Sequence, residues 1–118
     1  MKGKMGDRQR LQHILEDILE IENYTLNSTI DDFASNSMMR FASVKQIEII
    51  GEAANVVSAD TKNQFPQVEW RQIIGLRHIL VHEYFGIDTA LIWQIISTDI
   101  PKLKDDIQII ISSLDKTD

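Results

Sequence analysis

The chain has 118 residues, no cysteine and a formal net charge of −6. This length suits one domain with a buried core, and the lack of cysteine excludes disulfides and thiolate metal sites. No apolar run approaches the ~18 residues that a membrane span needs, and residues 1–10 lack the apolar core of a signal peptide. We therefore expect a cytoplasmic protein. The negative charge argues against a broad surface for nucleic acid, but not against a local basic site or a basic partner.

Apolar side chains recur at three- and four-residue spacing in the first part of the chain, which predicts an amphipathic helix. Asp7 is a favourable N-cap, so we expect the helix to begin there and to end within residues 24–27. Residues 28–33 are typical of a cap followed by a short turn or helix.

A second long helix is expected from Ser37 to about Ala59. Its apolar residues cover more than one face, which predicts packing on several sides. Gly51 lies inside this helix, beside Ala53 and Ala54, where a glycine costs ~1 kcal/mol relative to alanine. Close approach of another helix is the simplest compensation.

The rest of the chain predicts a polar loop over residues 60–67, a third helix from near Val68 to Gly86, and a last helix capped by Asp88. Pro101 should kink or restart this last helix. Residues 107–111 are rich in isoleucine and could form a strand, but their helical neighbours and the lack of any partner strand favour a helix.

Together these elements predict an all-α, up-and-down bundle of four main helices plus one short helix, a single domain over residues 1–118. Trp70 and Trp93 occur at helical spacing with apolar neighbours, so we expect both in the core.

The segment of residues 77–84, with the sequence Arg-His-Ile-Leu-Val-His-Glu-Tyr, concentrates the chemistry of the chain. Within about two helical turns it holds an arginine that is always charged, imidazoles that titrate near neutral pH, and a phenol. Arg77 could stabilise phosphate oxygens by paired hydrogen bonds. His82 could act as general base on a ribose 2′-hydroxyl or as general acid on the leaving oxygen. Tyr84 could orient the phosphate or accept a modification, and none of these roles needs a metal.

Arg77 and His82 do not share a face of one straight helix. They are five residues apart, which corresponds to about 140° around the axis. Two arrangements would bring them together: the helix ends near His82 so that the imidazole can swing round, or a second copy of the chain completes the site as a symmetric dimer.

Structural explanations exist for each of these residues. Arg77 could be an ion-pair partner of Glu48, Glu52 or Glu83. Glu48 and Glu52, four residues apart, are more typical of a solvated or ion-paired face than of an acid/base couple. His82 could form hydrogen bonds with backbone groups at a helix end, and Tyr84 could pack in the core beside Phe85.

His78 and His82, four residues apart, have the spacing of a two-histidine metal site. His13 is the one further histidine of the sequence, so we expect no metal.

The ordered series of motifs resembles the HEPN superfamily and, within it, the HepT-like toxins. It comprises Tyr24-Thr25, residues 49–54 (Ile-Ile-Gly-Glu-Ala-Ala), residues 66–77 from Pro66 to Arg77, residues 82–88 from His82 to Asp88, Trp93 and Pro101. The resemblance covers most of the chain, and a series of this length is much more specific than an Arg-x4-His match alone.

The resemblance implies a small helical bundle that forms a homodimer and places the Arg and His motifs of both subunits in a shared cleft. It implies a metal-independent endoribonuclease without a cofactor, acting on RNA, often transfer RNA, and leaving a 2′,3′-cyclic phosphate. The catalytic pair maps to Arg77 and His82. It further implies the toxin of a type VII-like toxin–antitoxin system, neutralised by an MntA-like nucleotidyltransferase that attaches AMP to the motif tyrosine, here Tyr84.

One residue departs from the family pattern. The position after the motif arginine is most often asparagine, whereas here it is His78, which could still donate a hydrogen bond and position a phosphate, but is bulkier. This departure and the negative charge keep a second function open: a non-catalytic HEPN module that binds a nucleotidyltransferase or a nucleotide. A third interpretation is a purely structural helical dimer.

Overall fold

The protein is described by a computed structural model that covers the backbone of residues 2–82 and 88–116 and the side chains of residues 6–78 and 88–116. The predicted all-α fold is confirmed, since these residues contain helices and no strand. No helix in the described part of the chain is long and apolar enough to cross a membrane.

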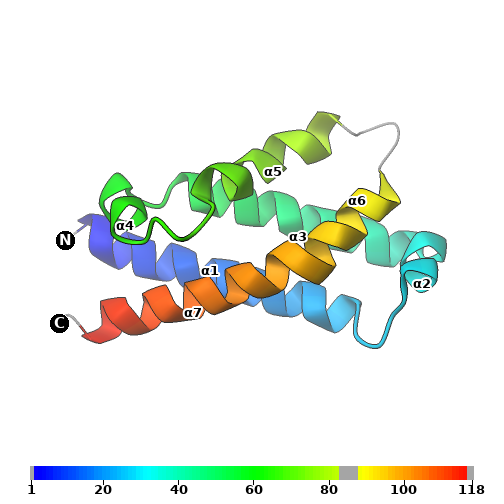
Figure 1. The fold of residues 1–118 in the computed structure, drawn as a ribbon, viewed down its shortest axis with the longest axis horizontal. Helices are drawn as coiled ribbons and strands as arrows, with labels where there is room; N and C mark the ends of the chain where they lie inside the picture. The colour runs from blue at the N-terminus through cyan, green and yellow to red at the C-terminus, as the bar shows by residue number, and fades with distance from the viewer. Residues whose placement is uncertain (1, 83–87, 117–118) are drawn as a thin grey trace.

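Four long helical segments run side by side and alternate in direction, as in an up-and-down bundle (Figure 1). They are α1 (Lys2–Tyr24), α3 (Ser37–Asn55), α5 (Trp70–His82) and a C-terminal segment that ends with α7 (Ile100–Lys116). Helix α3 packs against both α1 and α5, and α7 packs against the other side of α1. This arrangement makes α3 the support on which α5 lies.

The short helix expected after α1 is confirmed as α2 (Ile30–Ser35). Thr29 is its N-cap and accepts a hydrogen bond from the backbone N–H of Asp32, whose carboxylate accepts one from the N–H of Thr29 in return. This reciprocal capping box satisfies two backbone donors that the first turn of a helix otherwise leaves free.

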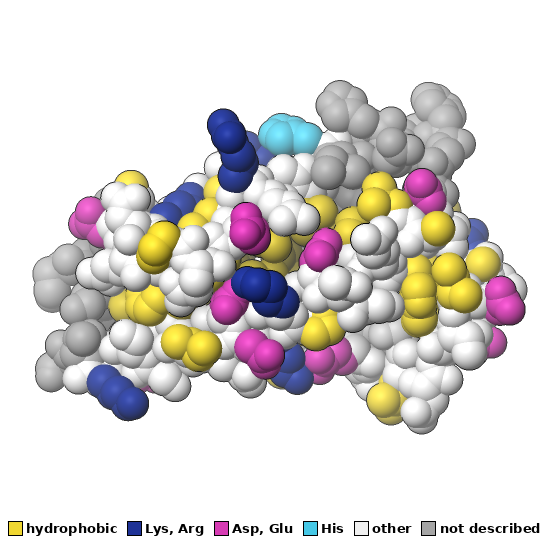
Figure 2. All heavy atoms as spheres, in the orientation of Figure 1, with side chains coloured by type: hydrophobic (Ala, Val, Ile, Leu, Met, Phe, Trp, Pro, Cys, Tyr) yellow, Lys and Arg dark blue, Asp and Glu magenta, His cyan; other side chains and the backbone are white. Residues whose placement is uncertain are grey.

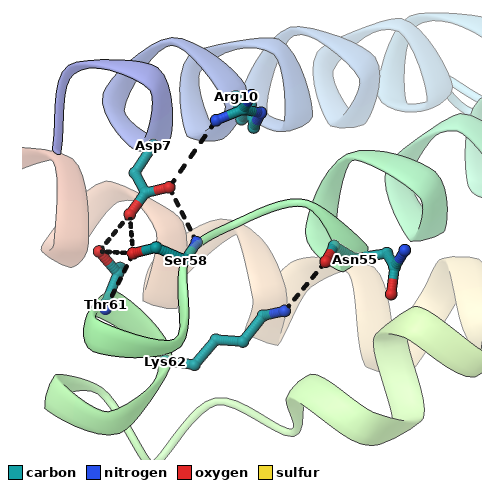
Figure 3. Close-up of polar contacts among 6 residues, drawn as sticks. All are labelled: Asp7, Arg10, Asn55, Ser58, Thr61 and Lys62. Atoms are coloured by element: carbon teal, nitrogen blue, oxygen red, sulfur yellow. Dashed lines mark hydrogen bonds and ion pairs between the residues drawn. The ribbon is translucent and has the colours of Figure 1, made fainter. Parts of the chain in front are cut away.

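The prediction that Asp7 caps the first helix is wrong, because α1 already begins at Lys2. Asp7 lies inside α1 and is fully buried. Its carboxylate accepts hydrogen bonds from the backbone N–H of Ser58 at 2.9 Å and from the hydroxyls of Ser58 and Thr61, each at 2.5 Å (Figure 3). Arg10 lies 4.0 Å from the same carboxylate. A buried carboxylate is tolerated only when paired in this way, so Asp7 fastens α1 to the segment after α3.

The second long helix ends at Asn55, four residues before the predicted Ala59, and part of the predicted loop is helical. The physical reason is Ser58, which accepts a hydrogen bond from the N–H of Thr61 and caps a new helix, α4 (Ala59–Gln64). Two short helices therefore accompany the long ones, not one.

The third long helix begins at Trp70, two residues after the expected start, because residues 65–68 form a turn. The indole Nε1 of Trp70 donates to the carbonyl of Phe65 at 2.9 Å and holds this turn against the start of α5.

Pro101 was predicted to kink or restart the last helix, and a new α-helix does begin next to it. A π-helical turn makes the transition. Asp88 caps α6 (Thr89–Gln94) as predicted, and α6 continues into the π turn η1 (Ile95–Asp99), then α7. The N–H of Ile100 bonds to the carbonyl of Ile95, five residues back. Proline has no N–H and its ring clashes with a carbonyl four residues earlier; the one-residue widening before Pro101 accommodates both.

The core contains aliphatic side chains from α1, α3, α5, α6, η1 and α7, with Trp70 buried and Trp93 partly buried beside Phe33 at a ring-centroid distance of 5.2 Å. Both tryptophans thus lie where the sequence predicts them. The fully buried aliphatic residues include Leu11, Ile14, Ile18, Ile21, Ile47, Ile50, Ile107 and Ile110.

Helix α3 packs against α1, α5 and α2, as its apolar pattern predicts, but one side of it stays exposed. Met38 is 83% exposed, Phe41 60% and Val56 52%, and Ile49 on the same face is also exposed. These four residues, the α3 apolar stripe, recur at helical spacing along one side of α3.

The close approach predicted at Gly51 is confirmed. A Cβ atom at Gly51 would lie 2.9 Å from the backbone nitrogen of Arg77, 3.2 Å from the Cβ of Arg77 and 3.2 Å from the carbonyl oxygen of Ile73. Real Cβ atoms do not approach backbone this closely, so only glycine lets α5 lie at this distance from α3.

Gly51→Ala should therefore lower the free energy of unfolding by about 1–3 kcal/mol, because α5 must move away, even though alanine is the better helix former. Gly75→Ala is the matched control: Gly75 is also inside a helix, but an added Cβ meets nothing within 4 Å. It should stabilise the protein by about 0.5–1 kcal/mol. Urea unfolding of both variants measures the difference, and equal effects would contradict the role of Gly51.

Candidate functional site

Helix α5 carries the candidate site and is fixed by its apolar face. Ile73 and Leu76 are buried on this face, and Arg77 follows on the flank that meets Gly51. Because the backbone of Arg77 itself touches α3, the starting point of its side chain is set by the packing of two helices. The candidate arginine is thus held by a rigid element and not by a loop.

The guanidinium of Arg77 has two described partners. Its Nη1 lies 3.6 Å from Oε2 of Glu52 on α3. Its Nε donates to Nε2 of His78 at 3.2 Å. Since Nε2 accepts, this bond requires the neutral imidazole with its proton on Nδ1. Glu52 and His78 together orient the guanidinium, whose side chain remains 22% exposed.

The ion pair with Glu52 is one of those that the sequence leaves open for Arg77. Glu52 is 62% exposed, and Glu48 pairs instead with Lys45 at 3.4 Å. Exposed pairs of this kind contribute about 0–1 kcal/mol. A weak, half-exposed ion pair leaves the arginine available to an anion that offers better geometry.

Two of the predicted site residues cannot be placed as side chains. His82 is the last residue of α5, and its backbone is helical, but its imidazole lies outside the described residues. Tyr84 and Gly86, the predicted end of the helix, lie outside them altogether. The structure therefore brings together Arg77 and His78, and it places the backbone of His82 one helical turn beyond His78.

Arg71 is a residue of this helix that the motif spacing does not single out. It is exposed, as is His78. The two are seven residues apart and therefore on one face of α5. The sequence signal for Arg71 was its spacing: it precedes His78 by seven residues, which puts the two residues on one face of a helix.

No group of three or more histidine, aspartate or glutamate side chains among the described residues is arranged to hold a metal ion. The predicted pair of His78 and His82 is not tested by this finding, since the side chain of His82 is not described.

Asp17 on α1 is a carboxylate with a displaced pKa, and it has no part in the motif. Burial raises its pKa to about 6 against the opposing charge of His13, and its buried Oδ2 accepts no hydrogen bond from the described residues. Because the folded-state pKa is above the unfolded value of 3.8, this group destabilises the fold progressively as the pH rises from about 4 to about 6. It is a cost to stability at neutral pH.

Comparison with known proteins shows the family of the chain. The model of a family described as "Ribonuclease HepT-like" matches residues 14–110. The chain belongs to this family, the HepT-like group of the HEPN superfamily. The match contains α2, α3, α4, α5 and α6, most of α7 and the second half of α1, and it spans residues 77–84.

Relatives of this HepT-like chain are named as ribonucleases. A "Putative RNase" of Methanocaldococcus jannaschii is 40% identical over 100 residues, which cover 85% of this chain and 92% of the relative. A "Probable ribonuclease HepT" of Thermococcus cleftensis is 36% identical over 101 residues, 86% of this chain and 92% of the relative. Among solved structures, none matches the chain significantly. These similarities support ribonuclease activity at the level of the family.

A substitution of Glu52 separates the structural from the functional interpretation of Arg77 in this HepT-like protein. Glu52→Gln should change the free energy of unfolding by less than about 1 kcal/mol, because the pair with Arg77 is exposed. Glu48→Gln, which removes the pair with Lys45 on the same helix, is the control. Urea unfolding measures both. A loss from Glu52→Gln several times that of the control would make Arg77 a structural ion-pair residue.

Proposed function

We propose that the protein is a metal-independent endoribonuclease and the toxin of a type VII-like toxin–antitoxin pair. The observation that carries the proposal is Arg77: a partly exposed arginine held against α3 by its own backbone and hydrogen-bonded to the imidazole of His78, in a chain of the HepT-like family. Arginine binds phosphate oxygens through paired hydrogen bonds, so this arrangement suits a phosphodiester substrate.

Arg77 stabilises the charge that develops on the two non-bridging oxygens of the scissile phosphate. Binding of the phosphate replaces the weak contact with Glu52, while His78, at 3.2 Å from Nε, keeps the guanidinium oriented. His78 thereby serves phosphate positioning at the place where the family most often has asparagine.

His82 moves the proton. The ribose 2′-oxygen attacks the adjacent phosphorus, the bond between phosphorus and the 5′-oxygen breaks, and the products are a 2′,3′-cyclic phosphate and a free 5′-hydroxyl. The imidazole of His82 takes the proton from the 2′-hydroxyl or gives one to the leaving 5′-oxygen. Tyr84 orients the phosphate. The reaction consumes no water, cofactor or metal.

A second copy of the chain completes the site in this proposal. Arg77 reaches towards α3, whereas residue 82 lies about 140° further round the axis of α5. The α3 apolar stripe of Met38, Phe41, Ile49 and Val56 borders Glu52 on the same helix and is the kind of exposed apolar surface that marks an interface. Pairing of two such stripes in a homodimer would bring two copies of α5 to one cleft.

The partner that neutralises the toxin is an MntA-like nucleotidyltransferase, which transfers AMP from ATP to the phenol oxygen of Tyr84 and releases pyrophosphate. An adenylate at this position adds a negative phosphate and a bulky nucleoside beside the catalytic pair. Both effects oppose binding of an RNA phosphate at Arg77.

A non-catalytic module that binds the nucleotidyltransferase is the alternative function. The observation in its favour is the net charge of −6 together with His78 in place of the usual asparagine. Under this alternative, the partner binds the chain, and purified protein does not cleave RNA.

His82→Ala should reduce the rate of RNA cleavage in EDTA by about 10²–10⁴-fold, which is the usual contribution of a general acid or base. Gel electrophoresis of total cellular RNA incubated with purified wild-type and variant protein measures the effect, and the fragments identify the target. The matched control is His13→Ala, because His13 is exposed on α1 and outside the motif. Cleavage by His82→Ala at the wild-type rate would exclude the proposed role, and a requirement for a divalent ion would exclude the mechanism.

Incubation with an MntA-like nucleotidyltransferase and ATP should add one or more AMP units to the wild-type chain and none to Tyr84→Phe. The phenol oxygen is the acceptor, and phenylalanine lacks it. Intact-mass spectrometry measures the gain. Tyr24→Phe is the matched control, since Tyr24 is the other tyrosine of the sequence. The same mass gain in Tyr84→Phe would place the modification elsewhere.

A further inference from the structure

The face of α5 that points away from the core carries the exposed side chains of Arg71 and His78. These two residues are seven apart, so their positions line up along the helix. Ile73 and Leu76 occupy the opposite, buried face. The space-filling view shows cationic and imidazole side chains standing next to each other over α5 at the upper edge of the molecule (Figure 2).

Nearly all other described cations already have a hydrogen-bond or ion-pair partner. Arg8, Arg10, Lys45, Arg77, Lys102 and Lys104 pair with carboxylates. Arg40 and Lys62 donate to backbone carbonyls. Within residues 6–78 and 88–116, Arg71 and Lys116 are the cations that make no hydrogen bond or ion pair with a described residue. Arg71 is thus an unpaired charge on the motif helix.

The position of Arg71 is not explained by stability. It lies in the first turn of α5, which contains no acidic residue. The helix dipole places partial positive charge at this end, so a cation is disfavoured there. An exposed arginine that is unpaired and locally repelled gains most from an anion that comes from outside the chain.

We propose that Arg71 is an RNA-binding residue which holds a phosphate of the substrate strand next to the scissile one. This inference rests on the proposed ribonuclease function and specifies how the substrate lies. Arg71 is six residues from Arg77, or about 9 Å along the helix axis, so it does not reach the phosphate that Arg77 holds. The strand therefore runs along the outer face of α5 towards its N-terminal end.

Charge complementarity selects RNA as the occupant. The chain carries 18 acidic and 12 basic residues, so its surface as a whole repels a polyanion. A strand is attracted where a cation is left unpaired, and Arg71 on the motif helix is such a cation. An acidic chain with this local charge binds RNA next to its catalytic pair and does not coat it.

The test is RNA binding by Arg71→Ala in a His82→Ala background, where cleavage does not interfere. The probe is a fluorescein-labelled, mixed-sequence, single-stranded RNA oligonucleotide, and fluorescence anisotropy gives Kd over a range of salt concentrations. We expect Kd to rise several-fold and the slope of log Kd against log salt concentration to fall by about 0.7 for each phosphate that the variant no longer neutralises. Arg71→Lys should keep most of the affinity, because it keeps the charge.

Lys116→Ala in the same background is the matched control, since it removes one unpaired described cation from the last turn of α7, outside the motif helix. It changes the net charge by the same amount and should leave Kd and the salt slope unchanged. Equal effects of Arg71→Ala and Lys116→Ala would overturn the inference. In the active background, Arg71→Ala should raise KM and leave kcat unchanged. Failure of the wild-type protein to cleave RNA would overturn the proposed function, whereas the binding measurement would still decide the role of Arg71.

Discussion

The contact between Gly51 of α3 and the backbone of Arg77 is the constraint on which the rest of the site depends. Without a side chain at residue 51, the two helices approach until the nitrogen of Arg77 lies 2.9 Å from the place where a Cβ would be. Glu52, the next residue on α3, then reaches the guanidinium. The glycine costs helix stability, and what it provides is a defined position for the arginine.

Most positive charges over the rest of the molecule are paired, which distinguishes them from the two arginines of α5. Most described basic side chains are paired with carboxylates or carbonyls, for example Lys104 with Glu22 at 3.0 Å and Arg8 with Asp115 at 3.1 Å. On α5, Arg77 has a weak and exposed partner, and Arg71 has none among the described residues. A net charge of −6 is therefore compatible with an RNA substrate, because the motif helix itself carries available positive charge. The same acidity disfavours non-specific binding elsewhere.

Helix type and order were predictable from the sequence because they depend on local patterns. Apolar periodicity gave the long helices, and the caps at Thr29 and Asp88 follow from residue chemistry at helix starts. The close approach at Gly51 was also predictable, since a glycine inside a helix needs a reason.

Other predictions were wrong because they depend on tertiary contacts. Asp7 has the chemistry of an N-cap, but its carboxylate binds Ser58 and Thr61, more than fifty residues away in the sequence. No local rule reports such a partner. The unpaired state of Arg71 is equally invisible in sequence, because it depends on where every carboxylate ends up. The motif could be recognised from the sequence. Positions 77 and 82 are about 140° apart around the helix axis, however, and the sequence leaves open how the two residues meet.

The central claim is that Arg77 of one subunit and His82 of the other act on one phosphate. Co-expression of Arg77→Ala and His82→Ala chains with different tags, followed by purification through both tags, yields the mixed dimer. In a shared site, the mixed dimer has one cleft with an intact pair and one with neither residue. RNA cleavage in EDTA at about half the wild-type rate per dimer, with each single variant inactive, is the predicted result. A mixed dimer as inactive as its parents would contradict the account and place both residues of the pair in the same chain.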